Sequence, residues 1–147
     1  MVCSFHTVLY NLNTFIKGYD VYQDIGTPEL FEELVAVRET QNTMDKYAVS
    51  VTKAGKVVGH LKKGKTGRFA KIIFYFLRAD KQNSCTAVVT GKAVNRGDGE
   101  GMSVPCTLKF EGQKKHISIL MSWARTTSNE NEQTLPDVTV KTVQTSV

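Results

Sequence analysis

Residues 38–51 read RETQNTMDKYAVSV and residues 55–60 read GKVVGH, and this stretch organises the rest of the chain. Towards the end of the first segment the residues alternate, so that Ser50 and Val51 fall on opposite faces, as in a half-buried strand. The Ala-Gly pair ending at Gly55 predicts a hairpin turn, because glycine accepts the positive φ that such turns need. A second strand then follows the turn.

The polar loop in this stretch is the first candidate for a functional site. It places Arg38, Asn42 and Asp45 close together in the sequence, and the hairpin returns His60 towards them. Arg38 has two open interpretations, an ion pair with Asp45 or a contact with a phosphate. Asp45 can also cap the turn through its own backbone, as Asp commonly does. We therefore expect these side chains to share one rim of a sheet.

The remaining elements are expected in the following order. A strand covers residues 33–39, and a helix begins near Arg68, because Phe69, Ile72, Ile73, Phe76 and Leu77 recur at the spacing of one helical face. Strands follow at 85–94 and 103–110, whereas 116–123 fits either a strand or a short helix. The residue pattern predicts an irregular N-terminal arm over 1–17, with a short strand near Thr7 to Leu12 as the alternative, a domain over 18–123 and a disordered polar tail over 124–147.

Composition limits the classes of protein that the chain can belong to. Its 147 residues, 41% of them hydrophobic and 22% charged, suit one globular domain. No apolar run is long enough to span a membrane, and no secretory signal is evident. Three cysteines without metal-ligand spacing indicate reduced thiols and a nuclear or cytoplasmic location. The sequence has no motif of an enzyme, a metal site or a cofactor site, so we expect a non-enzymatic protein.

Positive charge is concentrated in one part of the chain. The net charge is +5, and residues 46–79 contain nine lysines and arginines but no acidic residue. A run of one sign that spans a hairpin, a loop and a helix is typical of proteins that bind a polyanion. A solvated basic face remains the alternative explanation of the same pattern.

Taken together, the motif Arg38-Glu39-x-x-Asn42-x-x-Asp45 and the later Val57-Val58-Gly59-His60-Leu61 resemble the HIRAN domain family over about residues 18–123. The resemblance implies a mainly β fold, a small OB-like β-barrel carrying one or two helices. It also implies a module that binds single-stranded DNA and holds its 3′ end at the rim of the sheet. Members occur alone or fused to helicases and DNA-repair enzymes.

The resemblance assigns roles to residues of this chain by position. Asn42 and Asp45 match loop residues around the terminal nucleotide, and His60 and Lys63 match positions near the bound strand. Tyr22, with Tyr19 as the alternative, matches the place of an aromatic residue in the opening strand. The expected DNA-binding residues are Tyr22, Arg38, Asn42, Met44, Asp45, His60, Lys62, Lys63, Lys65 and Met102.

Two positions depart from the family pattern. Met44 and Met102 stand where related members have aromatic residues. Aromatic rings stack on bases for about 1–3 kcal/mol each, and a thioether keeps dispersion contact but loses most of that stacking. Two hypotheses follow from this difference. The first is a monomeric module that binds 3′ ends of single-stranded DNA, within a DNA-repair or chromatin assembly; the second is a protein-interaction adaptor on the same barrel.

Overall fold

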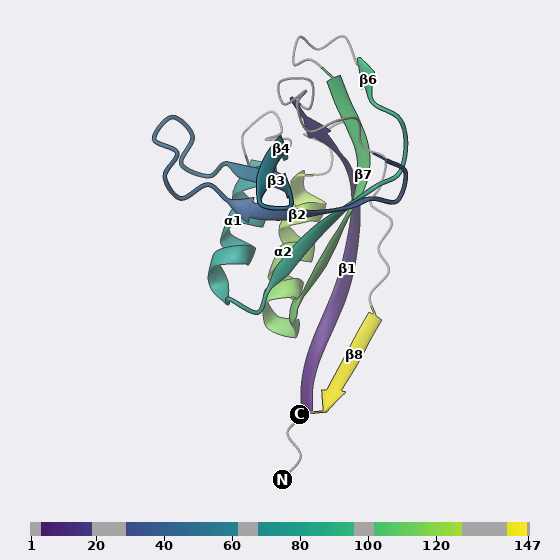
Figure 1. Cartoon of the computed structure of the whole chain (residues 1–147). Helices are drawn as coiled ribbons and strands as arrows, with labels where there is room; N and C mark the ends of the chain where they lie inside the picture. Colours follow the sequence, from purple (N-terminus) through teal and green to yellow (C-terminus); the bar gives the residue numbers. More distant parts are fainter. Residues whose placement is uncertain (1–3, 19–28, 62–67, 96–101, 128–140, 147) are drawn as a thin grey trace.

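A computed structural model of the chain describes residues 4–18, 29–61, 68–95, 102–127 and 141–146. The fold is mainly β with two helices that lie side by side next to the sheet (Figure 1). The elements are, in chain order, β1 (Ser4–Lys17), β2 (Glu33–Arg38), β3 (Val49–Lys53), β4 (Lys56–Leu61), α1 (Arg68–Ala79), β5 (Ser84–Val89), β6 (Val94–Asn95), β7 (Met102–Gln113), α2 (Lys114–Thr127) and β8 (Lys141–Ser146). Neither helix in the described part of the chain is long and apolar enough to cross a membrane.

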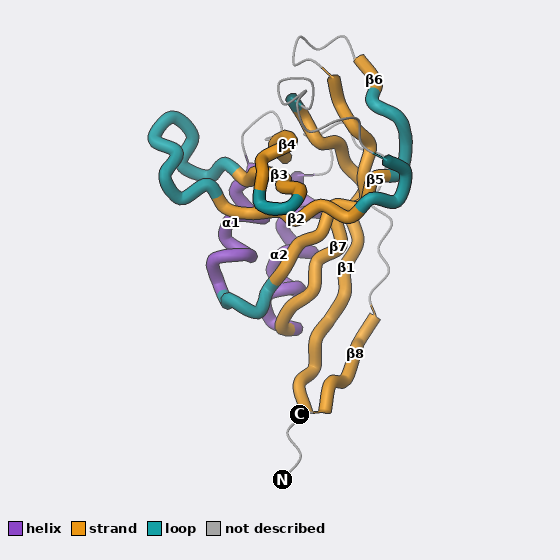
Figure 2. Tube along the Cα trace, viewed as in Figure 1, coloured by secondary structure: helices purple, strands orange, loops and turns teal. Residues whose placement is uncertain are grey.

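The sheet closes on itself. Six strands follow one another in the order β7-β5-β2-β3-β4-β1, and β1 also pairs with β7, which completes the barrel. Two further strands extend it, β6 beside β7 and β8 beside β1 (Figure 2). The β1–β4 seam is short: among the described residues, Ile16↔Leu61 and Lys17↔His60 are the pairs across it. This architecture confirms the expected small OB-like barrel.

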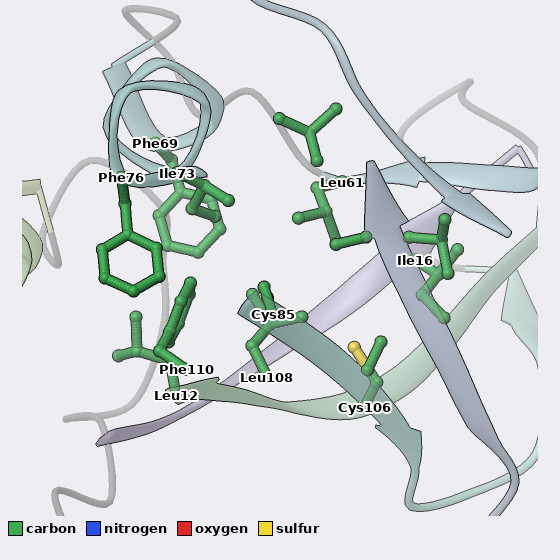
Figure 3. Packing of buried hydrophobic residues seen from close by; sticks show 14 of the residues in the cluster. Leu12, Ile16, Leu61, Phe69, Ile73, Phe76, Cys85, Cys106, Leu108 and Phe110 are labelled. Atoms are coloured by element: carbon green, nitrogen blue, oxygen red, sulfur yellow. The ribbon is translucent and has the colours of Figure 1, made fainter. Parts of the chain in front are cut away.

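Helix α1 closes the barrel interior with its apolar side. Phe69, Ile73 and Phe76 point from α1 towards the sheet, where Phe110 of β7 meets them (Figure 3). The rings of Phe76 and Phe110 pack edge to face with their centroids 5.5 Å apart. Burying a side chain of this size contributes about 1.5–3 kcal/mol. Asp80 ends the helix, because its side chain accepts a hydrogen bond from the Gln82 N–H at 2.8 Å.

The turn between β3 and β4 has the geometry that the sequence predicts. Ala54 and Gly55 both have positive φ, 51° and 80°, as the two central residues of a type I′ hairpin require. The strand face expected to be exposed is nevertheless buried. Ser50 and Val51 are 3% and 0% exposed, and Ser50 Oγ donates a hydrogen bond to the Val37 carbonyl. The half-buried interpretation of β3 was therefore wrong.

The N-terminal segment is a strand and not an irregular arm. β1 pairs with β7 from Thr7 to Lys17, and its buried residues Val8, Tyr10 and Leu12 alternate as strand residues do. The period is hard to see in the sequence, because apolar side chains such as Phe15 also stand on the other face of β1.

Three other expectations change at the level of elements. Residues 116–123 belong to a helix, since α2 buries Ile117, Leu120 and Ala124 at helical spacing. The tail over 124–147 was expected to lack structure, but α2 continues to Thr127 and β8 pairs with β1, whereas 128–140 lie outside the described residues. The single strand expected at 85–94 is two strands, β5 and β6.

Candidate functional site

The loop of residues 39–48, called the 39–48 loop below, is built by short-range hydrogen bonds. Its two ends meet where the Glu39 N–H donates to the Ala48 carbonyl at 2.9 Å. Asn42 Oδ1 accepts the N–H groups of Met44 and Asp45 at 3.0 and 2.8 Å. Asp45 Oδ1 in turn accepts the Tyr47 N–H at 3.3 Å. These bonds are why Asn and Asp occupy these positions: both residues stabilise turns by bonding the backbone two or three residues ahead.

A cavity of about 240 Å³ lies between this loop, β4 and the first turn of α1. Its polar lining comes from Asn42, Asp45 and His60. The rest of its lining is apolar: Ala48, Val49, Leu61 and Ala70. The structure thus brings together three residues that the sequence predicted as neighbours. Because Asn42 uses Oδ1 for the loop, its amide NH₂ is the group that can donate to a ligand.

Glu39 is a site residue that the sequence reasoning missed. Its Oε1 lies 2.5 Å from Nε2 of His60, an ion pair when the imidazole is protonated and a hydrogen bond when it is neutral. Both side chains are partly exposed, 27% for Glu39 and 35% for His60. Glu39 therefore orients the imidazole that lines the cavity. The available signal was the position of Glu39 inside the Arg38-Glu39 pair of the motif.

The family model for the HIRAN domain matches residues 9–115 of the chain. The chain belongs to the HIRAN domain family. This confirms the family expected from the motif around Asn42 and Asp45. No curated protein matches the sequence.

Solved HIRAN domains share the fold of this chain. The crystal structure of the HIRAN domain of human HLTF has a TM-score of 0.61 and 23% identity, over 82% of this chain and 91% of that one. An NMR structure of the HLTF HIRAN domain in its DNA-bound conformation has a TM-score of 0.58 and 22% identity, over 83% of this chain and 92% of that one. At these identities the likeness establishes the barrel and its helices, and no more.

The other predicted site residues of this HIRAN domain lie outside the cavity or outside the described part. The Arg38 guanidinium carbon lies 5.3 Å from the centroid of Phe74, a cation–π contact that the sequence did not predict. Met44 is 96% exposed on the 39–48 loop. Met102 begins β7, where it pairs with Asn95 of β6, and it does not line the cavity. Tyr22, Lys62, Lys63 and Lys65 fall outside the described residues.

Thiol and metal chemistry have no site in the described part of this HIRAN domain. Cys85 and Cys106 are buried in the barrel core. Burial raises the pKa of the Cys106 thiol to about 12 and that of Cys85 well above its ordinary value. Such thiols stay protonated, and a protonated thiol is a poor nucleophile and a poor metal ligand. Among the described residues, no group of three or more His, Cys, Asp or Glu side chains could hold a metal ion.

Proposed function

We propose that this HIRAN domain is a non-enzymatic module that binds single-stranded DNA and takes the 3′ end of the strand into the cavity beside the 39–48 loop. The observation that carries the proposal is the convergence of Asn42, Asp45 and His60 on one cavity of about 240 Å³. A solved HIRAN domain, that of HLTF, has been determined in a DNA-bound conformation, which supports nucleic acid as the ligand class.

The polar lining suits a strand end that carries a hydroxyl. The Asp45 carboxylate accepts the Tyr47 N–H through Oδ1, and because a carboxylate has about four lone-pair sites, one carboxylate can accept backbone N–H groups and a sugar 3′-hydroxyl at the same time. A terminal phosphate would instead bring negative charge against the carboxylate, which is unfavourable at short range. The amide NH₂ of Asn42 can donate to a base edge or to a sugar oxygen.

Charge supplies the attraction that brings a strand to the cavity. The chain carries a net charge of +5, and residues 46–79 hold nine basic residues and no acidic one. Such a segment attracts a polyanion regardless of its sequence, and the attraction weakens as salt is added. End selection and general attraction are therefore separate contributions, and an experiment has to separate them.

Fluorescence anisotropy with strands labelled at the 5′ end tests the proposal. One strand ends in a 3′-hydroxyl and a second, otherwise identical, ends in a 3′-phosphate. We expect wild type to prefer the hydroxyl, and Asp45→Asn to lose the preference while retaining the oxygen that accepts the Tyr47 N–H. Asp45→Ala should weaken binding to the hydroxyl end more than to the phosphate end. Equal losses on both strands would refute the end pocket.

A second candidate function is a protein-interaction module on the same barrel. The observation in its favour is the exposure of two large apolar side chains on α2, Ile119 at 59% and Trp123 at 44%. Absence of strand binding at low salt would favour this candidate over the first.

A nuclear or cytoplasmic location and a DNA-repair or chromatin assembly stay predictions from the sequence.

A further inference from the structure

Three aromatic rings cluster beside the cavity, where the 39–48 loop meets the outer side of α1. Tyr47 comes from the loop, and Phe74 and Tyr75 come from the helix. The ring centroid of Tyr47 lies 5.5 Å from that of Phe74 and 5.4 Å from that of Tyr75. Phe74 is buried, whereas the two tyrosines are only partly covered. Phe74 belongs to the hydrophobic core, and the two tyrosines extend that core outwards to the surface.

Four cationic groups lie over these rings. Lys71 Nζ is 4.8 Å from the Tyr47 centroid, and Arg78 Cζ is 4.4 Å from the Tyr75 centroid. Lys46 also lies over Tyr47, at 5.6 Å, and Arg38 lies over Phe74 at 5.3 Å. We call these three rings and four cations the cation–aromatic surface.

The rings hold the cations in position before any ligand arrives. A flexible lysine or arginine loses rotamer entropy when it binds, and a cation–π contact of about 0.5–1 kcal/mol at an exposed site removes part of that cost beforehand. Lys71 and Arg78 cover one face of the Tyr47 and Tyr75 rings, so those faces are not open for bases to stack on. What the surface offers to a ligand is mainly positive charge in fixed positions. Ordered positive charge of this kind matches the phosphates of a nucleic-acid backbone.

The two tyrosine hydroxyls add a directed donor. Tyr75 Oη donates to Tyr47 Oη at 3.2 Å, so Tyr47 keeps its own hydroxyl hydrogen for an acceptor in a ligand. The pKa shifts of the two phenols agree with Tyr75 as the donor and Tyr47 as the acceptor. The hydrogen bond from Tyr75 lowers the pKa of Tyr47, with help from nearby lysines, and the same bond raises the pKa of Tyr75.

The cation–aromatic surface adjoins the cavity along the 39–48 loop and along α1. Along the loop, Tyr47 stands between Asp45 and Ala48, which both line the cavity. Along the helix, Ala70 lines the cavity and Lys71 follows it directly. A chain that leaves the cavity over this side therefore meets Tyr47 and Lys71 first.

We propose that the cation–aromatic surface binds the phosphodiester backbone of the nucleotides that precede the one in the cavity. The inference rests on the proposed function, since the cavity defines where the strand ends. Contacts to phosphates carry no base information, so this surface fixes the position of the strand without selecting its sequence. An acidic peptide is the competing occupant of the same charge, and the experiment includes it.

The test removes two of the four cations and compares the result with a matched removal elsewhere. Lys71→Gln/Arg78→Gln lowers the charge of the cation–aromatic surface, whereas Lys92→Gln/Lys109→Gln removes the same charge from exposed positions outside the basic segment 46–79. Thermal unfolding checks that both variants fold. Anisotropy titrations over a range of salt concentrations then give the slope of the logarithm of affinity against the logarithm of salt.

We expect Lys71→Gln/Arg78→Gln to make that slope shallower by about 0.7 for each cation removed, the value for a single strand, and to weaken binding equally for 3′-hydroxyl and 3′-phosphate strands. The loss should grow with oligonucleotide length until the strand covers the surface. Lys92→Gln/Lys109→Gln should keep nearly the wild-type slope. Equal slopes in the two variants would overturn the inference.

Failure of the inference and failure of the end pocket give different results. If Asp45→Asn leaves the end preference unchanged but Lys71→Gln/Arg78→Gln still reduces the slope, the cation–aromatic surface stands and the end pocket falls. If the end preference depends on Asp45 but the salt slope does not depend on Lys71 and Arg78, the end pocket stands and the cation–aromatic surface falls. Poly-glutamate serves as the peptide probe. Loss of its binding in Lys71→Gln/Arg78→Gln, with strand binding like that of the control, would assign the surface to an acidic peptide and overturn the proposal.

Discussion

Nε2 of His60 and Oε1 of Glu39 are in hydrogen-bond contact, at 2.5 Å, although β2, which ends just before Glu39, and β4, which carries His60, are not neighbours in the sheet. Glu39 directly follows β2, His60 lies in β4, and β3 runs between them. Glu39 is itself fixed by its backbone bond to Ala48 at the end of the 39–48 loop. The imidazole that lines the cavity is thus oriented by the loop that forms the other wall.

Removing the Glu39 side chain should weaken strand binding without unfolding the domain. We expect Glu39→Ala to lower affinity about fivefold to tenfold, up to about 1.4 kcal/mol, because His60 loses the acceptor that orients it. Glu39→Gln keeps an acceptor oxygen and should restore most of the affinity. Anisotropy measures the affinity, and thermal unfolding tests that the melting temperature changes little. In the double variant Glu39→Ala/His60→Ala the two losses should not add. Additive losses would mean that Glu39 does not act through His60.

The buried thiols make stability depend on pH in the alkaline range. Burial raises the pKa of Cys106 from an ordinary value of 9.0 to about 12, so the folded state keeps a proton that the unfolded state releases. The resulting stabilisation is complete below pH 9.0 and is lost as pH rises towards 12.

Urea unfolding on the alkaline side of pH 9.0 checks this dependence against a variant without the group. Cys106→Ala should lower stability at neutral pH, because it leaves a small cavity, yet it should show a shallower decline above pH 9.0. Comparing slopes within each protein removes the contribution of the other titrating groups. Identical slopes in wild type and Cys106→Ala would contradict the assignment.

β1 and β4 approach so closely at Gly59 that there is no room for a side chain at this position. A Cβ at this position would lie 2.8 Å from the Lys17 carbonyl oxygen and 2.6 Å from Ile16 Cγ2. We expect Gly59→Ala to destabilise the domain by about 1–3 kcal/mol and to weaken strand binding, because it displaces the neighbouring His60. Gly55→Ala is the matched control. It meets nothing within 4 Å at φ +80° and should cost only backbone strain of about 1 kcal/mol, with binding unchanged.

Local features of the sequence predicted local structure well. The turn at Ala54 and Gly55 and the helix around Phe69 to Phe76 depend on residues close in the chain, and both are present. The full length of β1 was missed, with only a short strand near Thr7 to Leu12 left open, because its register depends on β7, about a hundred residues away, and because both of its faces carry apolar side chains. Pairing with β7, and not the residue pattern of β1 itself, determines that this segment is a strand.

The same distinction separates the predicted from the missed site residues. Asn42, Asp45 and His60 could be grouped from the sequence, because one loop and one hairpin connect them. The contact of Glu39 with His60 spans 21 residues and that of Tyr47 with Tyr75 spans 28, and neither follows from a repeat or a motif spacing. Both depend on how the barrel curves and where α1 packs.

Asn42 offers the clearest separation of a structural role from a binding role. Its Oδ1 holds the 39–48 loop through the N–H groups of Met44 and Asp45, while its NH₂ faces the ligand in the proposed function. Asn42→Asp keeps the acceptor but replaces the donor with negative charge, so we expect near-normal stability in urea unfolding and clearly weaker binding to an anionic strand. Asn42→Ala loses both, and should cost about 0.5–2 kcal/mol of stability as well. The exposed neighbour Thr43 provides the control, since Thr43→Ala should change neither quantity appreciably. Wild-type affinity in Asn42→Asp would show that the amide does not contact the strand.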